Sequence, residues 1–103
     1  MSDGIFAGQV AVVTGGAQGI GFAISRLLSE RGATVCLVDI DKAKTEEAVA
    51  KLSKGGAKAR GYEADVTKEP TLQRARDAIL RDCGRADVLV NNAGIYPHAT
   101  IRE

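Results

Sequence analysis

The stretch Val12-Val13-Thr14-Gly15-Gly16-Ala17-Gln18-Gly19-Ile20-Gly21 decides the fold of this chain of 103 residues. It places four glycines directly behind the β-branched run Val10 to Val13. Glycine loses more conformational freedom on folding than any other residue, so such a cluster needs a structural reason. The apolar run before it predicts a strand buried on both faces, which is typical of a parallel sheet.

Predicted helices and strands alternate along the rest of the chain. Strands are predicted at Val10–Val13, Ala33–Asp39, Ala57–Ala64 and within Ala86–Gly94, with helices from Gly19 to Gly32, over Lys42–Lys54, and from Glu69 to Gly84. Helices of this length between strands require parallel pairing through right-handed crossovers. The predicted fold class is therefore α/β, with a Rossmann-like doubly wound parallel sheet of about four strands.

The first helix has apolar residues at helical spacing. We expect its inner stripe to consist of Ile20, Ala23, Ile24, Leu27 and Leu28. Ser25 is expected to face away from the sheet, together with the charged residues of this helix.

Composition excludes several classes of function. The chain is 45% hydrophobic and 26% charged, with a formal net charge of +1. This balance provides no electrostatic footprint for nucleic acid or for an anionic membrane surface. The sequence has no apolar run of membrane-spanning length and no signal peptide, so we expect a cytoplasmic protein. Cys36 and Cys83 are interpreted as small buried hydrophobes, with a metal site or a disulfide as the alternative, and His98 as an exposed loop residue.

The glycine cluster lies where a predicted strand ends and a predicted helix begins. The first turn of a helix has unpaired N–H groups and a partial positive charge, so it binds phosphate well if the backbone is accessible. We expect Gly15 to permit the tight exit from the strand, Gly19 to let the backbone meet the ligand, and Gly21 to let the helix pack closely on the sheet. A nucleotide pyrophosphate is the predicted ligand, and a simple tight turn is the alternative. No Gly-Lys-Ser/Thr follows, which disfavours an NTPase.

Asp39 ends the second predicted strand about 20 residues after the glycine turn, where a carboxylate can accept hydrogen bonds from the adenosine ribose. A turn-forming aspartate is the alternative. A 2′-phosphate beside this carboxylate would be repelled, so NAD is favoured over NADP as the cofactor. Lys42 and Lys44 could soften this preference.

Four motifs together resemble the short-chain dehydrogenase/reductase family. They are the T-G-x-x-x-G-I-G turn at Thr14–Gly21, the acid Asp39, the Asp-Val pair at 65–66, and Asn-Asn-Ala-Gly at 91–94. They follow one another at family spacing over almost the whole chain. For the last motif taken by itself, a polar turn at the end of a strand is the alternative.

The resemblance implies a set of cofactor contacts. Backbone groups around Gln18, Gly19 and Ile20 would bind the pyrophosphate, and Asp39 would bind the ribose. The adenine would lie against Asp65 and Val66. Asn91, Ala93 and Gly94 would lie along the path to the nicotinamide, unless Asn91 acts mainly through the structure of the sheet.

The resemblance covers the amino-terminal half of the family, so residues 1–103 are expected to be part of a single dinucleotide-binding domain. The family's catalytic serine, tyrosine and lysine follow the Asn-Asn-Ala-Gly motif. Neither Tyr62 nor Tyr96 has a lysine four residues later, so no catalytic residue is assigned and the chain alone is expected to be inactive. A small alcohol or ketone substrate and a homodimer or homotetramer of the full-length protein are implied. The alternatives are a stand-alone nucleotide-binding or interaction module and a chain completed by a partner polypeptide.

Overall fold

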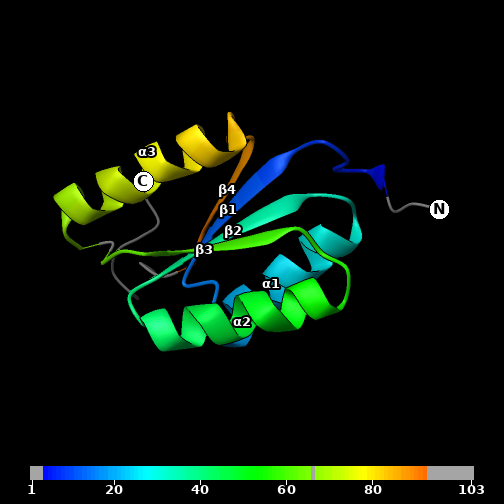
Figure 1. Ribbon diagram of the computed structural model, residues 1–103, viewed down its shortest axis with the longest axis horizontal. Helices are drawn as coiled ribbons and strands as arrows, with labels where there is room; N and C mark the ends of the chain where they lie inside the picture. The colour runs from blue at the N-terminus through cyan, green and yellow to red at the C-terminus, as the bar shows by residue number, and fades with distance from the viewer. Residues whose placement is uncertain (1–3, 66, 93–103) are drawn as a thin grey trace.

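The computed structural model describes residues 4–65 and 67–92 (Figure 1). Its elements are, in order, β1 (Val10–Thr14), α1 (Gly19–Glu30), β2 (Thr34–Asp39), α2 (Lys42–Lys54), β3 (Ala59–Glu63), α3 (Glu69–Cys83) and β4 (Val88–Asn91). The predicted alternation of strands and helices is confirmed.

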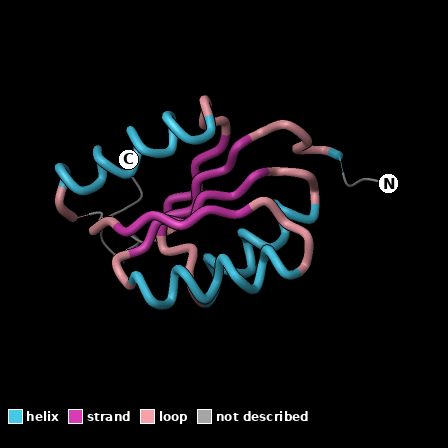
Figure 2. The backbone as a smooth tube through the Cα atoms, viewed as in Figure 1, coloured by secondary structure: helices cyan, strands magenta, loops and turns pink. Residues whose placement is uncertain are grey.

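The strands form one parallel sheet in the order β3-β2-β1-β4. The chain runs outward from β1 through β2 to β3 and then crosses back to the other side of β1. Helices α1 and α2 therefore cover one face of the sheet and α3 covers the other (Figures 1 and 2). This is the predicted doubly wound arrangement. In such sheets ligands bind beyond the carboxyl ends of the strands, at the point where the strand order reverses, which here lies between β1 and β4.

Two hydrophobic clusters hold the helices to the sheet. Side chains alternate between the faces along a strand, so Val10 and Val12 pack towards α3 while Ala11 packs towards α1 and α2. Every residue of β1 is buried, which explains its continuous apolar sequence. Cys36 is fully buried in the α3-side cluster, as expected for a small hydrophobe, whereas Cys83 is half-buried and packs against that cluster.

The predicted inner stripe of α1 is wrong at Ile20, Ala23 and Leu27, which are exposed, whereas Leu28 packs against the core as predicted. Ile20 and Leu27 are 72% and 49% exposed, whereas Gly21 and Ser25 are buried. The helix lies so close to the exit from β1 that only small residues fit between them. The hydroxyl of Ser25 donates to the carbonyl of Gly21 at 2.8 Å, so its burial leaves no unpaired polar group.

Within residues 4–65 and 67–92, none of the helices has both the length and the apolar character required to cross a bilayer.

Candidate functional site

The carboxyl ends of the four strands converge at one edge of the sheet. Thr14 at the end of β1 is in register with Val38 on β2 and with Asn91 on β4, and Asp39 is in register with Glu63 on β3. The residues that follow these strand ends include the glycine turn and Asp65. The structure thus brings the described candidate residues of all four motifs to a single edge.

The glycine turn leaves β1 in a conformation that favours glycine. Gly15 has φ +66°, and its N–H donates to the carbonyl of Val38 at 2.7 Å. Gly16 is enclosed, because a Cβ there would lie 2.7 Å from Leu37 Cδ2 and 2.9 Å from the carbonyl oxygen of Val13. The role expected for Gly15 is consistent with this geometry, and Gly16 is an additional packing position that the spacing argument did not single out.

Gly21 lets α1 approach the turn. A Cβ at Gly21 would lie 2.0 Å from the carbonyl oxygen of Gly15 and 3.0 Å from Asn92 Nδ2. The close contact expected at Gly21 is therefore present, but its partner is the glycine turn and the end of β4 rather than the face of the sheet.

The start of α1 is accessible. Gln18, Gly19 and Ile20 are exposed, and a Cβ at Gly19, where φ is +59°, would have nothing within 4 Å. Gln18 precedes the helix without a side-chain capping hydrogen bond, and no acidic residue lies in the first turn. The first N–H groups of a helix have no acceptor within the helix. These residues fit an anionic group, since the start of the helix is exposed, its first N–H groups have no acceptor within the helix, and the helix dipole favours negative charge there.

The carboxylate of Asp39 is fixed beside this turn. Asp39 is buried, and its Oδ2 accepts a hydrogen bond from the N–H of Ala17 at 3.3 Å. Its Oδ1 accepts from the N–H of Asp41 at 3.2 Å. A carboxylate has about four acceptor sites, so two backbone donors leave capacity for a hydroxyl-bearing ligand. Ala17, which the sequence did not identify as a site residue, links the turn to β2.

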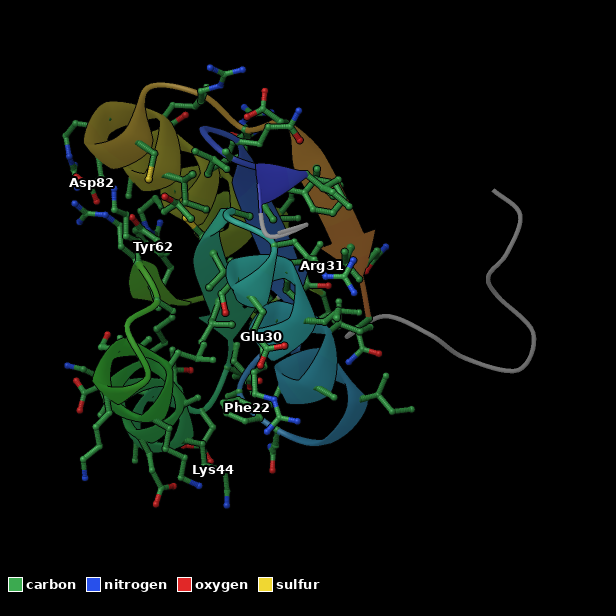
Figure 3. All side chains as sticks on the ribbon, turned by 90° about the vertical axis from the view of Figure 1, so that its right-hand side faces the viewer. Phe22, Glu30, Arg31, Lys44, Tyr62 and Asp82 are labelled. Carbon is green, nitrogen blue, oxygen red and sulfur yellow. The ribbon has the colours of Figure 1, made fainter. Side chains whose placement is uncertain are left out.

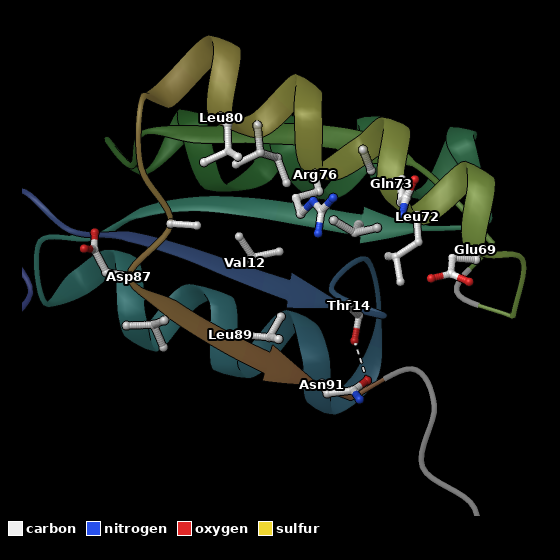
Figure 4. A pocket seen from close by; sticks show the side chains of 15 residues that line it. Val12, Thr14, Glu69, Leu72, Gln73, Arg76, Leu80, Asp87, Leu89 and Asn91 are labelled. Atoms are coloured by element: carbon white, nitrogen blue, oxygen red, sulfur yellow. Dashed lines mark hydrogen bonds between the residues drawn. The ribbon is translucent and has the colours of Figure 1, made fainter. Parts of the chain in front are cut away.

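A threonine hydroxyl ties the end of β4 to β1. Thr14 Oγ1 accepts from the N–H of Asn92 at 2.9 Å and lies within donating distance of Asn91 Oδ1, at 3.1 Å, and of the Val90 carbonyl, at 3.3 Å (Figure 4). The side-chain amide of Asn92 donates to the Gly15 carbonyl at 3.4 Å. Thr14 and Asn92 stood in the quoted motifs but were not proposed as site residues. The contact of Asn91 with Thr14 joins β4 to β1, which matches the structural role in the sheet that was the alternative for Asn91.

Asp65 lies just after β3 and is organised by its own loop. Its Oδ1 accepts hydrogen bonds from the N–H and the hydroxyl of Thr67. These bonds, and the nearby Lys68, hold the pKa of the Asp65 carboxyl below its usual range. The carboxylate is thus kept ionised at the same edge of the sheet as Asp39.

Two hollows adjoin this edge. One, of about 250 Å³, lies between the start of α1 and α2 and is lined by residues that include Gln18, Gly19, Phe22 and Lys44 (Figure 3). The other, of about 560 Å³, lies between α3 and the strands β1 and β4, and Thr14 and Asn91 line one part of it (Figure 4). The second hollow is lined largely by apolar side chains of α3 and β4, such as Leu72 and Leu89.

Three predicted cofactor contacts, Val66, Ala93 and Gly94, lie outside the described residues, as do Tyr96 and His98.

Comparison with known proteins identifies the family. Residues 9–103 match the family model described as short chain dehydrogenase. The D-threitol dehydrogenase of Mycolicibacterium smegmatis is 40% identical over 96 residues, which cover 93% of this chain and 37% of that enzyme. This chain therefore spans little more than a third of the length of that relative.

Solved structures agree with this result. An NAD⁺-bound xylitol dehydrogenase superposes with a TM-score of 0.84 at 39% identity, covering 87% of this chain and 35% of that one. A metagenomic short-chain oxidoreductase in complex with NADP gives a TM-score of 0.82 at 39% identity, covering 87% and 41% of the two chains. The doubly wound sheet, the glycine turn and these similarities lead to one conclusion: the chain belongs to the short-chain dehydrogenase/reductase family of oxidoreductases.

Proposed function

We propose that this chain is the cofactor-binding part of an NAD(P)-dependent dehydrogenase, with the cofactor pyrophosphate at the start of α1 and with NAD preferred. One observation carries the proposal. The backbone at Gly19 faces open space at the N-terminus of a helix, while the Asp39 carboxylate is hydrogen-bonded to Ala17 in the same turn. Phosphate and ribose partners thus lie beside one another.

The pyrophosphate contacts are proposed to come from the backbone around Gln18, Gly19 and Ile20. These residues are exposed and belong to the beginning of α1. Gly15 and Gly21 would shape the turn rather than bind directly, because their contacts are with the protein itself. The favourable helix dipole and the unpaired amides supply the attraction.

Asp39 supports the preference for NAD. Its remaining acceptor sites suit the two hydroxyls of an adenosine ribose. A 2′-phosphate about 4 Å away would be repelled by about 4 kcal/mol at an effective dielectric constant near 20. Even a third of that repulsion corresponds to about a tenfold difference in affinity. Lys44 lines the neighbouring hollow, as does Lys51, and a cation there would reduce this difference.

The two ends of the cofactor are assigned by position. We place the adenine against Asp65 and Val66, and the path towards the nicotinamide along Asn91, Ala93 and Gly94. The exposed side chain of Asn91 lies at the end of β4, next to β1, where the strand order reverses. Ligands in doubly wound sheets bind at this point.

The reaction proposed for the whole protein is hydride transfer between the nicotinamide and an alcohol or carbonyl carbon. The bound nicotinamide would supply the hydride chemistry, and the groups that move the proton are expected from the remainder of a longer protein. An alcohol substrate is supported by the names of the related D-threitol and xylitol dehydrogenases. A homodimer or homotetramer is part of the same proposal.

Cofactor binding is tested by titrating the purified protein with NADH and following ligand fluorescence. Gly19→Ala introduces a Cβ into the proposed phosphate site at φ +59°, whereas Gly56→Ala introduces one at φ +95° in a remote turn, with open space in both cases. Both variants carry backbone strain of about 1–2 kcal/mol. A difference between their NADH affinities therefore reports on the site itself and not on the strain. We expect Gly19→Ala to bind NADH about tenfold more weakly, equivalent to roughly 1.4 kcal/mol, and Gly56→Ala to bind it normally. Equal affinities for the two variants would contradict the proposed site.

A further inference from the structure

The two cysteines of the chain meet across the interface between the sheet and α3. Cys36 lies in the middle of β2, and Cys83 is the last residue of α3. Their Sγ atoms are 3.8 Å apart, although 47 positions separate them in sequence. They belong to the same hydrophobic cluster. Because a disulfide has an S–S distance of about 2.05 Å, the sulfurs must approach by roughly 1.8 Å to bond.

The position of Cys83 makes this approach feasible. Cys83 ends its helix, and Gly84 follows in the left-handed conformation with φ +80°. Residues at a helix end fray more readily than those in the interior. Cys36, by contrast, is held by β-ladder pairing with both β1 and β3. The required movement therefore falls on the end of α3 and leaves the sheet in place.

Solvent reaches only one of the two cysteine residues. Cys36 is completely buried, whereas Cys83 is partly exposed and lines an open hollow of about 760 Å³ together with Arg60, Asp82 and Arg85. A small oxidant entering this hollow meets Cys83 first. Arg60 and Arg85 line the same hollow, where Arg60 is paired with Asp82 and Arg85 with Asp87.

The carboxylate of Asp82, the residue that precedes Cys83, is already engaged by neighbouring groups. Asp82 accepts a hydrogen bond from the hydroxyl of Tyr62 at 2.8 Å, and its carboxylate lies 3.2 Å from Arg81 Nε and 3.9 Å from Arg60 Nη1 (Figure 3). These partners hold the pKa of the Asp82 carboxyl below its usual range. Burial, with the proximity of Cys83, raises the pKa of the Cys36 thiol to about 12, so Cys36 stays protonated until a partner sulfur is activated.

We propose that Cys36 and Cys83 form an oxidant-responsive dithiol that closes to an intramolecular disulfide when hydrogen peroxide reaches Cys83. The Cys83 thiolate attacks one peroxide oxygen, the O–O bond breaks, and hydroxide leaves, which gives a sulfenic acid. The Cys36 sulfur then attacks the Cys83 sulfur. The S–S bond forms, the S–O bond breaks, and the oxygen leaves as water with the Cys36 proton. In total, two thiols are oxidised and one peroxide is reduced to two waters.

The bond would tie the end of α3 to β2. Cys83 lies at the end of α3 and Cys36 pairs with Val12 in the middle of the sheet, away from the glycine turn that follows Thr14. The proposed disulfide is therefore independent of the cofactor site, and its test does not depend on whether the chain binds a cofactor.

The test is peroxide oxidation of the native full chain, followed by alkylation of free thiols and mass spectrometry with peptide mapping. We expect a species lighter by two hydrogens that takes up no alkylating agent, contains a peptide linking residues 36 and 83, and returns to the dithiol with dithiothreitol. Cys36→Ala should instead retain oxygen on Cys83 or link two molecules through Cys83. Cys83→Ser should leave Cys36 reduced.

Two results would overturn the proposal. One is a wild-type protein that keeps two alkylatable thiols after exposure to peroxide. The other is accumulation of sulfinic acid at Cys83 without the linked peptide. The peptide map of the wild-type protein is sufficient to decide whether the disulfide forms. The test therefore remains valid even if a variant fails to fold.

Discussion

Replacing Gly21 by alanine should separate α1 from the turn that it is packed against. The new Cβ would lie 2.0 Å from the carbonyl oxygen of Gly15, so helix or turn must move by about 1 Å to restore an ordinary contact of at least 3 Å. Overpacking of this kind costs up to about 3 kcal/mol. Because alanine is favoured over glycine inside a helix by about 1 kcal/mol, the expected net loss in the free energy of unfolding is about 2 kcal/mol.

Urea unfolding followed by circular dichroism measures this loss, with Gly55→Ala as the matched control. Gly55 has φ −83°, and the nearest atom to a new Cβ is the Leu52 carbonyl oxygen at an ordinary 3.5 Å. We expect Gly55→Ala to change the free energy of unfolding by no more than about 0.5 kcal/mol. If the two variants were equally stable, the close contact between α1 and the Gly15 turn would not hold the site together.

Substitutions at three further positions test other parts of the site and fold. Asp39→Asn should lower the ratio of the NADPH dissociation constant to the NADH dissociation constant by about tenfold. An unchanged ratio in parallel titrations would argue against ribose binding by Asp39. Thr14→Val should destabilise the protein by about 1–3 kcal/mol in urea unfolding, because the N–H of Asn92 loses its acceptor, while Thr14→Ser should retain most of that stability. Asp87 accepts two hydrogen bonds from Arg85 and one from the N–H of Val10, which lower its pKa. The ionised Asp87 carboxylate stabilises the fold fully above the ordinary carboxyl pKa, and this stabilisation is lost as the pH falls through the lowered pKa of Asp87 in the folded protein. The urea midpoint of Asp87→Asn should therefore decline less steeply in acid than that of the wild type. An equally steep decline in both proteins would refute a stabilising role for the Asp87 carboxylate.

Local patterns in the sequence were sufficient to predict the layers of the fold. The helix Lys42–Lys54 is confirmed at both ends, since Asp41 caps it and Gly55-Gly56 follow it. The third strand is shorter than predicted and begins at Ala59. Its weak apolar pattern reflects its place at the edge of the sheet, where all five of its residues are exposed or half-buried.

Hydrophobic periodicity predicted only part of the buried face of α1. That method treats large apolar residues as inward, whereas the space beside the Gly15 turn admits only Gly21 and Ser25. The large apolar residue Ile20 is then left exposed. Size, rather than polarity, decides which residues can face so close a backbone.

Contacts between distant segments also escaped prediction. The bond from Ala17 to Asp39 and those joining Thr14 to Asn91 and Asn92 depend on how the ends of β1, β2 and β4 lie together in the sheet, which local sequence patterns do not show. The glycine spacing indicated an accessible helix start, and a suitable start is present at Gly19. It did not reveal that the same motif anchors two neighbouring strands.

The hydrogen bond between Ala17 and Asp39 has a consequence for redesigning cofactor choice. The carboxylate that would discriminate against a 2′-phosphate is also the acceptor that secures the loop entering α1. Replacing Asp39 with a cationic residue would remove both the hydrogen-bond acceptor of the loop and the charge that disfavours a 2′-phosphate. The loop would become more mobile, and an incoming ligand would have to order it again at a cost in binding free energy. A short neutral side chain with a hydrogen-bond acceptor at position 39 would retain the bond to Ala17. A variant that accepts both NAD and NADP should therefore be easier to engineer than one that prefers NADP.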